Sequence, residues 1–138
     1  MINKVEIRKM IEEFLREMQE WEIRCLRREH ACDTGSGEYE DAERDGMQEY
    51  LELFKKYCSP DACPRDYYYS DPPEYDHEQQ VIESIEETGE CSAIVSISTT
   101  TSSEERFQYL LEYEGTNWKI RKKSYVSKVD GRLIDANL

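Results

Sequence analysis

The first thirty residues carry apolar side chains at the spacing of an amphipathic helix. Successive apolar positions lie three or four residues apart, which places them in one stripe along a helical surface. The stripe consists of Ile7, Ile11, Phe14, Met18, Trp21 and Cys25. Asn3 precedes it and Glu6 follows three residues later, an arrangement that resembles a capping box. The pattern predicts a helix over about residues 4–29, with its stripe in the core or, alternatively, in the seam of a homodimer.

A second helical periodicity begins at the end of the segment CDTGSGEYE, whose glycines, serine and threonine interrupt the first. Lys55 and Lys56 suit the negative end of a helix dipole. Ser59-Pro60 ends the helix, because the residue before a proline disfavours helical geometry. We therefore predict a helix over about residues 38–57 that pairs with the first in an antiparallel or crossed arrangement.

The second half of the chain alternates apolar and polar residues, as half-buried strands do. Segments rich in β-branched and aromatic residues are separated by TGE, TSSE and EGTN, which are typical of turns. The predicted strands cover about residues 79–87, 91–101, 105–114 and 117–128, joined in successive hairpins. A short extended stretch is predicted at 66–70, and the tail VDGRLIDANL is expected to fold back as a turn over the last strand.

Helices followed by an antiparallel meander indicate one α+β domain over residues 1–138. In such a domain the two N-terminal helices pack on one face of a curved, mostly antiparallel sheet. The length of 138 residues is that of a single domain with one core.

The composition is strongly acidic, with 31 Asp and Glu against 18 Lys and Arg and a formal net charge of -13. This charge disfavours nucleic acid and anionic membranes as partners and favours a basic protein, although acidic residues also serve solubility. Charges interrupt the apolar residues of the N-terminus, so neither a signal peptide nor a membrane span is predicted. Five cysteines, an odd number, favour reduced thiols. The expected location is the cytoplasm.

The acidic residues are concentrated in one part of the chain. Residues 66–105 contain eleven acidic residues and no Lys or Arg, whereas six basic residues lie between Arg106 and Lys128. The acidic candidates for partner binding, around the first predicted hairpin, are Glu83, Glu86, Glu87 and Glu90. Candidate aromatic anchors beside them are Tyr67, Tyr68, Tyr69 and Tyr75, whose alternative role is to complete the core.

The residue patterns that could carry catalysis or metal binding are weak. Asp76-His77 resembles an acid/base couple, but no nucleophile or second base accompanies it, and a solvated loop histidine is favoured. Tyr50 and Tyr57 could reach a cavity, but tyrosines in a helical apolar stripe usually pack. The other candidates are Cys58 and Cys63, with Cys25, His30 and Cys32, which lack the paired spacing of a zinc site. No nucleotide-binding or hydrolase motif is present, so neither a metal nor a cofactor is expected.

Two segments carry a resemblance to a known family: SDPPEYDHEQQVIESIEETGECSAIVSIS and ERFQYLLEYEGTNWKIRKKSYV. They resemble the bacterial immunity-protein branch of the nuclear-transport-factor-2-like superfamily, whose cone-shaped, cystatin-like α+β fold has the same element order. The resemblance implies a noncatalytic protein that binds and neutralises a cognate polymorphic toxin, thereby protecting the producing cell. It carries over no residue-level toxin-binding motif.

The same fold also hosts isomerases and dehydratases, and a fold alone does not decide function. The alternative is therefore a small cavity enzyme or a ligand-binding protein.

Overall fold

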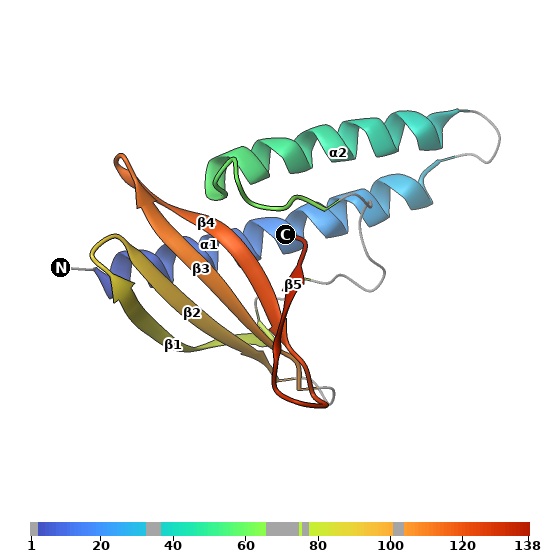
Figure 1. The fold of residues 1–138 in the computed structure, drawn as a ribbon. Coiled ribbons are helices and arrows are strands. Elements are labelled where there is room, and N and C mark those ends of the chain that lie inside the picture. Colours follow the sequence, from blue (N-terminus) through green and yellow to red (C-terminus); the bar gives the residue numbers. More distant parts are fainter. Residues whose placement is uncertain (1–2, 33–36, 66–74, 76–77, 101–103) are drawn as a thin grey trace.

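The computed structural model describes residues 3–32, 37–65, 75, 78–100 and 104–138. Two helices are followed by a five-stranded sheet (Figure 1). The elements are α1 (Lys4–His30), α2 (Glu38–Tyr57), β1 (Gln80–Gly89), β2 (Ser92–Thr99), β3 (Arg106–Glu114), β4 (Asn117–Val126) and β5 (Leu133–Ala136). Both helices lie within one residue of their predicted bounds, and the predicted α+β fold class is confirmed. The predicted stretch 66–70 lies outside the described residues.

Helix α1 begins and packs as its sequence dictates. The Asn3 side chain accepts hydrogen bonds from the N–H groups of Val5 and Glu6, at 3.1 and 3.2 Å. These bonds satisfy two of the donors that a helix N-terminus leaves without partners. Every residue of the predicted stripe is at most 1% exposed, so the stripe forms part of the core.

The two helices form an antiparallel pair (Figure 1). The indole N–H of Trp21 on α1 donates to the carbonyl oxygen of Gly46 on α2 at 2.8 Å, within the buried contact. Arg28 donates to Glu49 at 2.6 Å, and Lys56 donates to Glu17 at 3.0 Å. A polar rim thus surrounds the apolar contact between the helices.

The strands follow chain order in the sheet, and every neighbouring pair is antiparallel. The face against which the helices pack is called the inner face; in Figure 1 α1 passes behind the strands and α2 lies alongside α1. The register places Val95 opposite both Ile85 on β1 and Tyr109 on β3, and all three are buried. Alternate residues of these three strands therefore contribute to the core.

A β-bulge in β4 reverses the phase of this alternation. Leu111 pairs with Ile120 and Leu110 pairs with Lys122, which leaves Arg121 as the extra residue. Beyond the bulge, Lys123 faces inward and is 2% exposed, whereas Lys122 faces outward. An uninterrupted period of two would place Lys123 on the same face as Lys119.

The C-terminal tail corrects one prediction. A turn does occur, with the Ser127 N–H donating to Arg132 O at 2.8 Å, but Leu133–Ala136 then pairs with β4 as the fifth strand. Leu138 is 1% exposed, and its main-chain oxygen accepts from the Tyr50 hydroxyl at 2.8 Å. These contacts join residues that lie far apart in the sequence. A strand of four residues also gives too short an alternation to be recognised.

Candidate interaction surface

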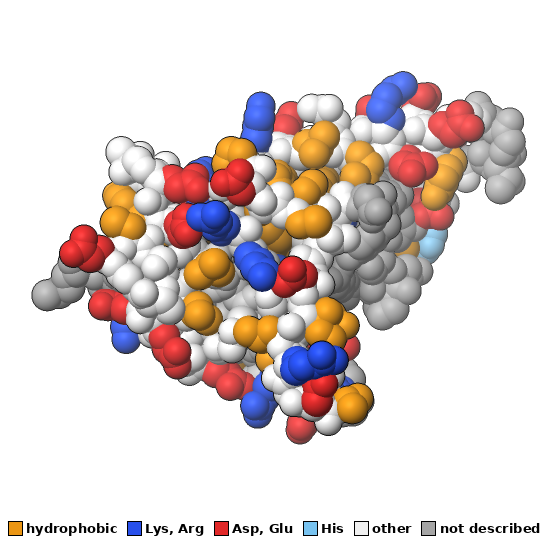
Figure 2. All heavy atoms as spheres, viewed as in Figure 1, with side chains coloured by type: hydrophobic (Ala, Val, Ile, Leu, Met, Phe, Trp, Pro, Cys, Tyr) orange, Lys and Arg blue, Asp and Glu red, His pale blue; other side chains and the backbone are white. Residues whose placement is uncertain are grey.

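Acidic side chains gather along β1 and the turn into β2. We call this group, Glu83, Glu86, Glu87 and Glu90, the acidic hairpin; all four are exposed. Figure 2 shows acidic side chains along the β1 border of the sheet. Within the described part of the chain, none of the four forms an ion pair.

The cations of β4 are engaged within the protein. The Lys119 ammonium donates to the carbonyl oxygens of Lys55 and Lys56, at 3.2 and 2.7 Å, and so caps the C-terminus of α2. Arg121 donates to both carboxylate oxygens of Glu112 at 2.7 Å.

The next two lysines are also held by the protein. Lys122 pairs with Asp135 at 2.9 Å. Lys123 is buried, with its ammonium 3.3 Å from the Tyr75 hydroxyl and 4.9 Å from the centre of the Phe107 ring. Four of the six basic residues between Arg106 and Lys128 are therefore engaged within the protein, whereas Arg106 on β3 is exposed. The four exposed carboxylates of the acidic hairpin outnumber it on this sheet.

The structure separates the predicted tyrosine anchors. Tyr67, Tyr68 and Tyr69 lie outside the described residues. Tyr75 is 0% exposed, its N–H donates to Glu22 at 3.0 Å, and its ring meets Phe14 edge-on. Tyr75 thus has the alternative role that we considered, completion of the core, and it is not a surface anchor in this conformation.

The tyrosines considered for a cavity are also packed in the core. Tyr50 is 1% and Tyr57 is 4% exposed. Burial raises the pKa of each to about 12, so both hydroxyls stay protonated at neutral pH and neither can act as a general base there. Asp76 and His77 lie outside the described residues.

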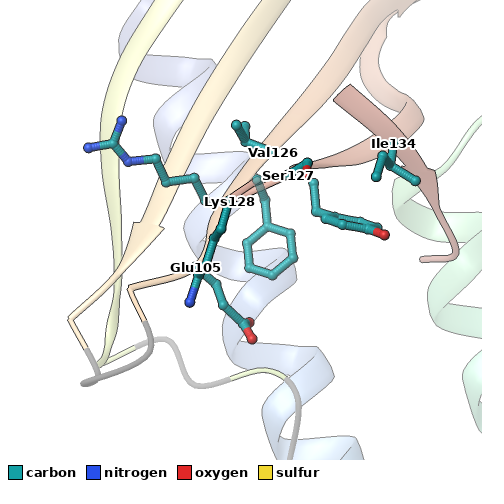
Figure 3. A pocket seen from close by; sticks show the side chains of 8 residues that line it. Glu105, Val126, Ser127, Lys128 and Ile134 are labelled. Atoms are coloured by element: carbon teal, nitrogen blue, oxygen red, sulfur yellow. The ribbon is translucent and has the colours of Figure 1, made fainter. Parts of the chain in front are cut away.

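A cavity of about 610 Å³ opens at the end of the sheet where β3, β4 and β5 meet. In Figure 3, Glu105 and Lys128 lie at one end of the cavity and Ile134 at the other. The described lining includes Phe107 and Tyr125 but no histidine or cysteine. Its titratable residues are Glu105, Arg106, Tyr125 and Lys128.

The cysteine and carboxylate positions give no metal site among the described residues. Cys58 is buried, and burial raises its pKa to about 12, whereas Cys63 is exposed and its thiol donates to Asn137 at 3.1 Å. Among the described helices, none is long and apolar enough to cross a membrane.

Comparison with known proteins decides the family. A family model described as "NTF2 fold immunity protein" matches residues 6–137. The chain belongs to this NTF2 fold immunity protein family. Immunity protein RhsIA of Dickeya dadantii (strain 3937) is 27% identical over 137 residues, which cover 94% of each protein. No solved structure matches the chain.

Family membership confirms the resemblance found in the sequence, including the cone-shaped NTF2-like fold. Two surface features of this family member were missed by sequence reasoning. The engagement of the β4 cations depends on partners remote in the chain, so no local signal reports it. The second feature is an apolar pair, Ile94 and Leu110, on the outer face of the sheet; its signal is an apolar residue at a position where alternation predicts a polar one.

Proposed function

We propose that this protein neutralises a cognate polymorphic toxin by binding it, without catalysis of its own, and so protects the bacterium that makes both. The observation that carries the proposal is the family match, which spans residues 6–137. The relative named immunity protein RhsIA supports it over nearly the full length of both chains. We place the protein in the cytoplasm of the producing cell, where it would meet a toxin that acts inside cells.

We further propose that the acidic hairpin steers a basic toxin domain towards the protein. Uncompensated surface carboxylates raise the rate at which an oppositely charged partner meets them, and they contribute less to the final affinity. Tyr67, Tyr68 and Tyr69, which precede this hairpin in the sequence, remain candidate anchors. Support for a basic partner comes from the net charge of -13 and from the absence of ion pairs to the four acids among the described residues.

The same acids have a second physical explanation. β1 is an edge strand of the described sheet, and its pairing with β2 is irregular near Glu83 and near Thr88. Bulges and charges on an edge strand discourage pairing with the edges of other molecules. Lysine protects an edge as well as glutamate does. A Glu→Lys substitution should therefore keep the edge protected but remove the attraction for a basic toxin, which distinguishes the two explanations.

Co-expression tests the proposed function directly. We expect the cognate toxin domain to be encoded immediately upstream. This domain is induced in a bacterial host, alone or together with this protein. We expect growth to stop with the toxin alone and to continue when this protein is present. Continued growth arrest, with both proteins expressed and folded, would contradict the proposal.

A further inference from the structure

The outer face of the sheet, turned away from the helices, has an apolar centre. Ile94 on β2 and Leu110 on β3 pair directly across the two strands. Their neighbours Ala93, Val95 and Leu111 fill the core, so the alternation turns Ile94 and Leu110 outward. Both are half-buried, and in Figure 1 α1 lies behind the strands, on the opposite face. No described helix or strand therefore packs over this pair.

A hollow lies beside the apolar pair. One cross-strand row of the outer face consists of Ser84, Ser96, Gln108 and Ser124. Serine side chains are short, and a hollow of about 420 Å³ lies over Ser96 and Gln108, with Glu83, Arg106 and Leu133 among its lining residues. Leu133 is 54% exposed. The hollow can accept a large side chain from a partner.

Charge is uneven around this centre. Glu86 pairs with Ile94, so the acidic hairpin borders the apolar pair on the β1 side. On the β4 side, Lys122 pairs with Leu110 but is neutralised by Asp135 at 2.9 Å. Figure 2 shows hydrophobic side chains in the middle of the sheet and acidic ones along its β1 border. The face thus combines an apolar centre with an acidic rim on the β1 side, and the exposed Arg106 is the basic residue in the lining of the hollow.

We infer that the toxin docks on this outer face, an inference that rests on the proposed function. A protruding apolar or aromatic side chain of the toxin enters the hollow over Ser96 and contacts Ile94 and Leu110. Lysine or arginine residues beside that side chain meet Glu83 and Glu86. This arrangement matches the usual anatomy of a protein interface, in which a desolvated apolar centre provides most of the affinity and a polar rim surrounds it.

A basic toxin fits this face better than a second copy of the chain does. Each copy carries a net charge of -13 and brings its own acidic rim. Two such surfaces repel one another, whereas a basic partner has the complementary charge.

Substitutions on the outer face test the inference with the purified full-length chain and the toxin domain encoded upstream. Ser96→Tyr fills the hollow, and the double variant Ile94→Thr/Leu110→Thr removes much of the apolar pair while keeping residues that favour strands. Gln48→Tyr adds the same ring to an exposed site on α2 and serves as the matched control. Surface plasmon resonance measures both rate constants, and circular dichroism verifies that each variant is folded.

We expect both outer-face variants to raise the toxin dissociation rate about tenfold or more, as the loss of a central anchor does. The control should bind like the wild type. Folded outer-face variants that dissociate at the wild-type rate would overturn the docking face while leaving the proposed function intact. A wild-type dimer that Ser96→Tyr separates, with toxin binding unchanged, would show that the face joins copies of this chain and would also overturn the inference. Failure of the wild type to bind toxin would overturn both proposals.

Discussion

A single hydroxyl group joins three distant parts of the chain. The Tyr50 hydroxyl on α2 donates to the main-chain oxygen of Leu138 at 2.8 Å and accepts from the Arg65 N–H at 3.0 Å. Both hydrogen bonds are buried, so neither group has water as an alternative partner. The Arg65 side chain also donates to Leu138 at 3.1 Å, which ties the end of the chain to the core.

We predict that Tyr50→Phe lowers the free energy of unfolding by about 1–3 kcal/mol, because it removes two buried hydrogen bonds, one from the Arg65 N–H and one to the main-chain oxygen of Leu138. Urea denaturation followed by circular dichroism measures this change. Tyr125→Phe is the control, since Tyr125 is 40% exposed, and we expect it to change stability by about 0.5 kcal/mol or less. Equal effects of the two substitutions would contradict the role assigned to Tyr50.

The adjacent lysines on β4 differ in burial, because the bulge turns Lys123 towards the core and Lys122 towards solvent. The Lys123 stem lies in the core, and its ammonium lies 4.7 Å from the centre of the Tyr75 ring. Lys122 is exposed, and its ion pair with Asp135 is a surface pair. Surface pairs contribute about 0–1 kcal/mol to stability.

We predict that Lys123→Ala destabilises the fold by at least about 2 kcal/mol, because it opens a cavity among aromatic rings and removes the buried hydrogen bond from Lys123 to the Tyr75 hydroxyl. Lys122→Ala should cost about 1 kcal/mol or less. Thermal unfolding of the two variants at matched pH compares them. A larger loss of stability from Lys122→Ala would mean that Lys122, rather than Lys123, faces the core, as it would in a strand without the bulge.

At the scale of elements, the helices and the four long strands could be predicted from the sequence because their signals are local. The stripe from Ile7 to Cys25 and the alternation from Ala93 to Ile97 each report burial within one element. β5 could not be found in this way, because its four residues are held by pairing with β4 rather than by their own pattern. The bulge at Arg121 depends on register between strands, which periodicity within one strand does not contain.

The acidic hairpin gives a prediction for the binding rate. Glu86→Lys/Glu90→Lys should slow association with the toxin domain by about fivefold or more at low salt, with little change in dissociation. The difference in association rate between the variant and the wild type should become smaller at higher salt, since charges are screened over about 8 Å at physiological ionic strength. Stopped-flow or surface plasmon resonance measurements at two salt concentrations provide the test.

The matched control is Glu43→Lys/Glu52→Lys, which makes the same change in net charge at exposed positions of α2. An effect of the same size in both double variants would assign the steering to net charge rather than to the hairpin. Unchanged association for the hairpin variant at both salts would leave edge protection as the explanation of these acids, because lysine also protects an edge.

At the scale of the whole molecule, the folded chain distributes charge differently from the sequence. The sequence contrasts an acidic stretch at 66–105 with a basic one at 106–128. Folding places Lys119 at the end of α2, pairs Lys122 with Asp135 and buries Lys123. The acids of the β1–β2 hairpin have no such partners among the described residues. Counting charges along the chain therefore identifies the acidic surface correctly but overstates the basic one.

The central claim is that this protein neutralises its toxin by stoichiometric binding. The most direct measurement titrates a fixed amount of the upstream-encoded toxin domain with this protein and follows residual toxin activity. We predict that residual toxin activity falls linearly with added protein and reaches its end point at a fixed molar ratio near one to one. This ratio should not change with longer incubation. Complete loss of toxin activity at a small fraction of one equivalent, increasing with time, would reveal catalytic inactivation and contradict the claim.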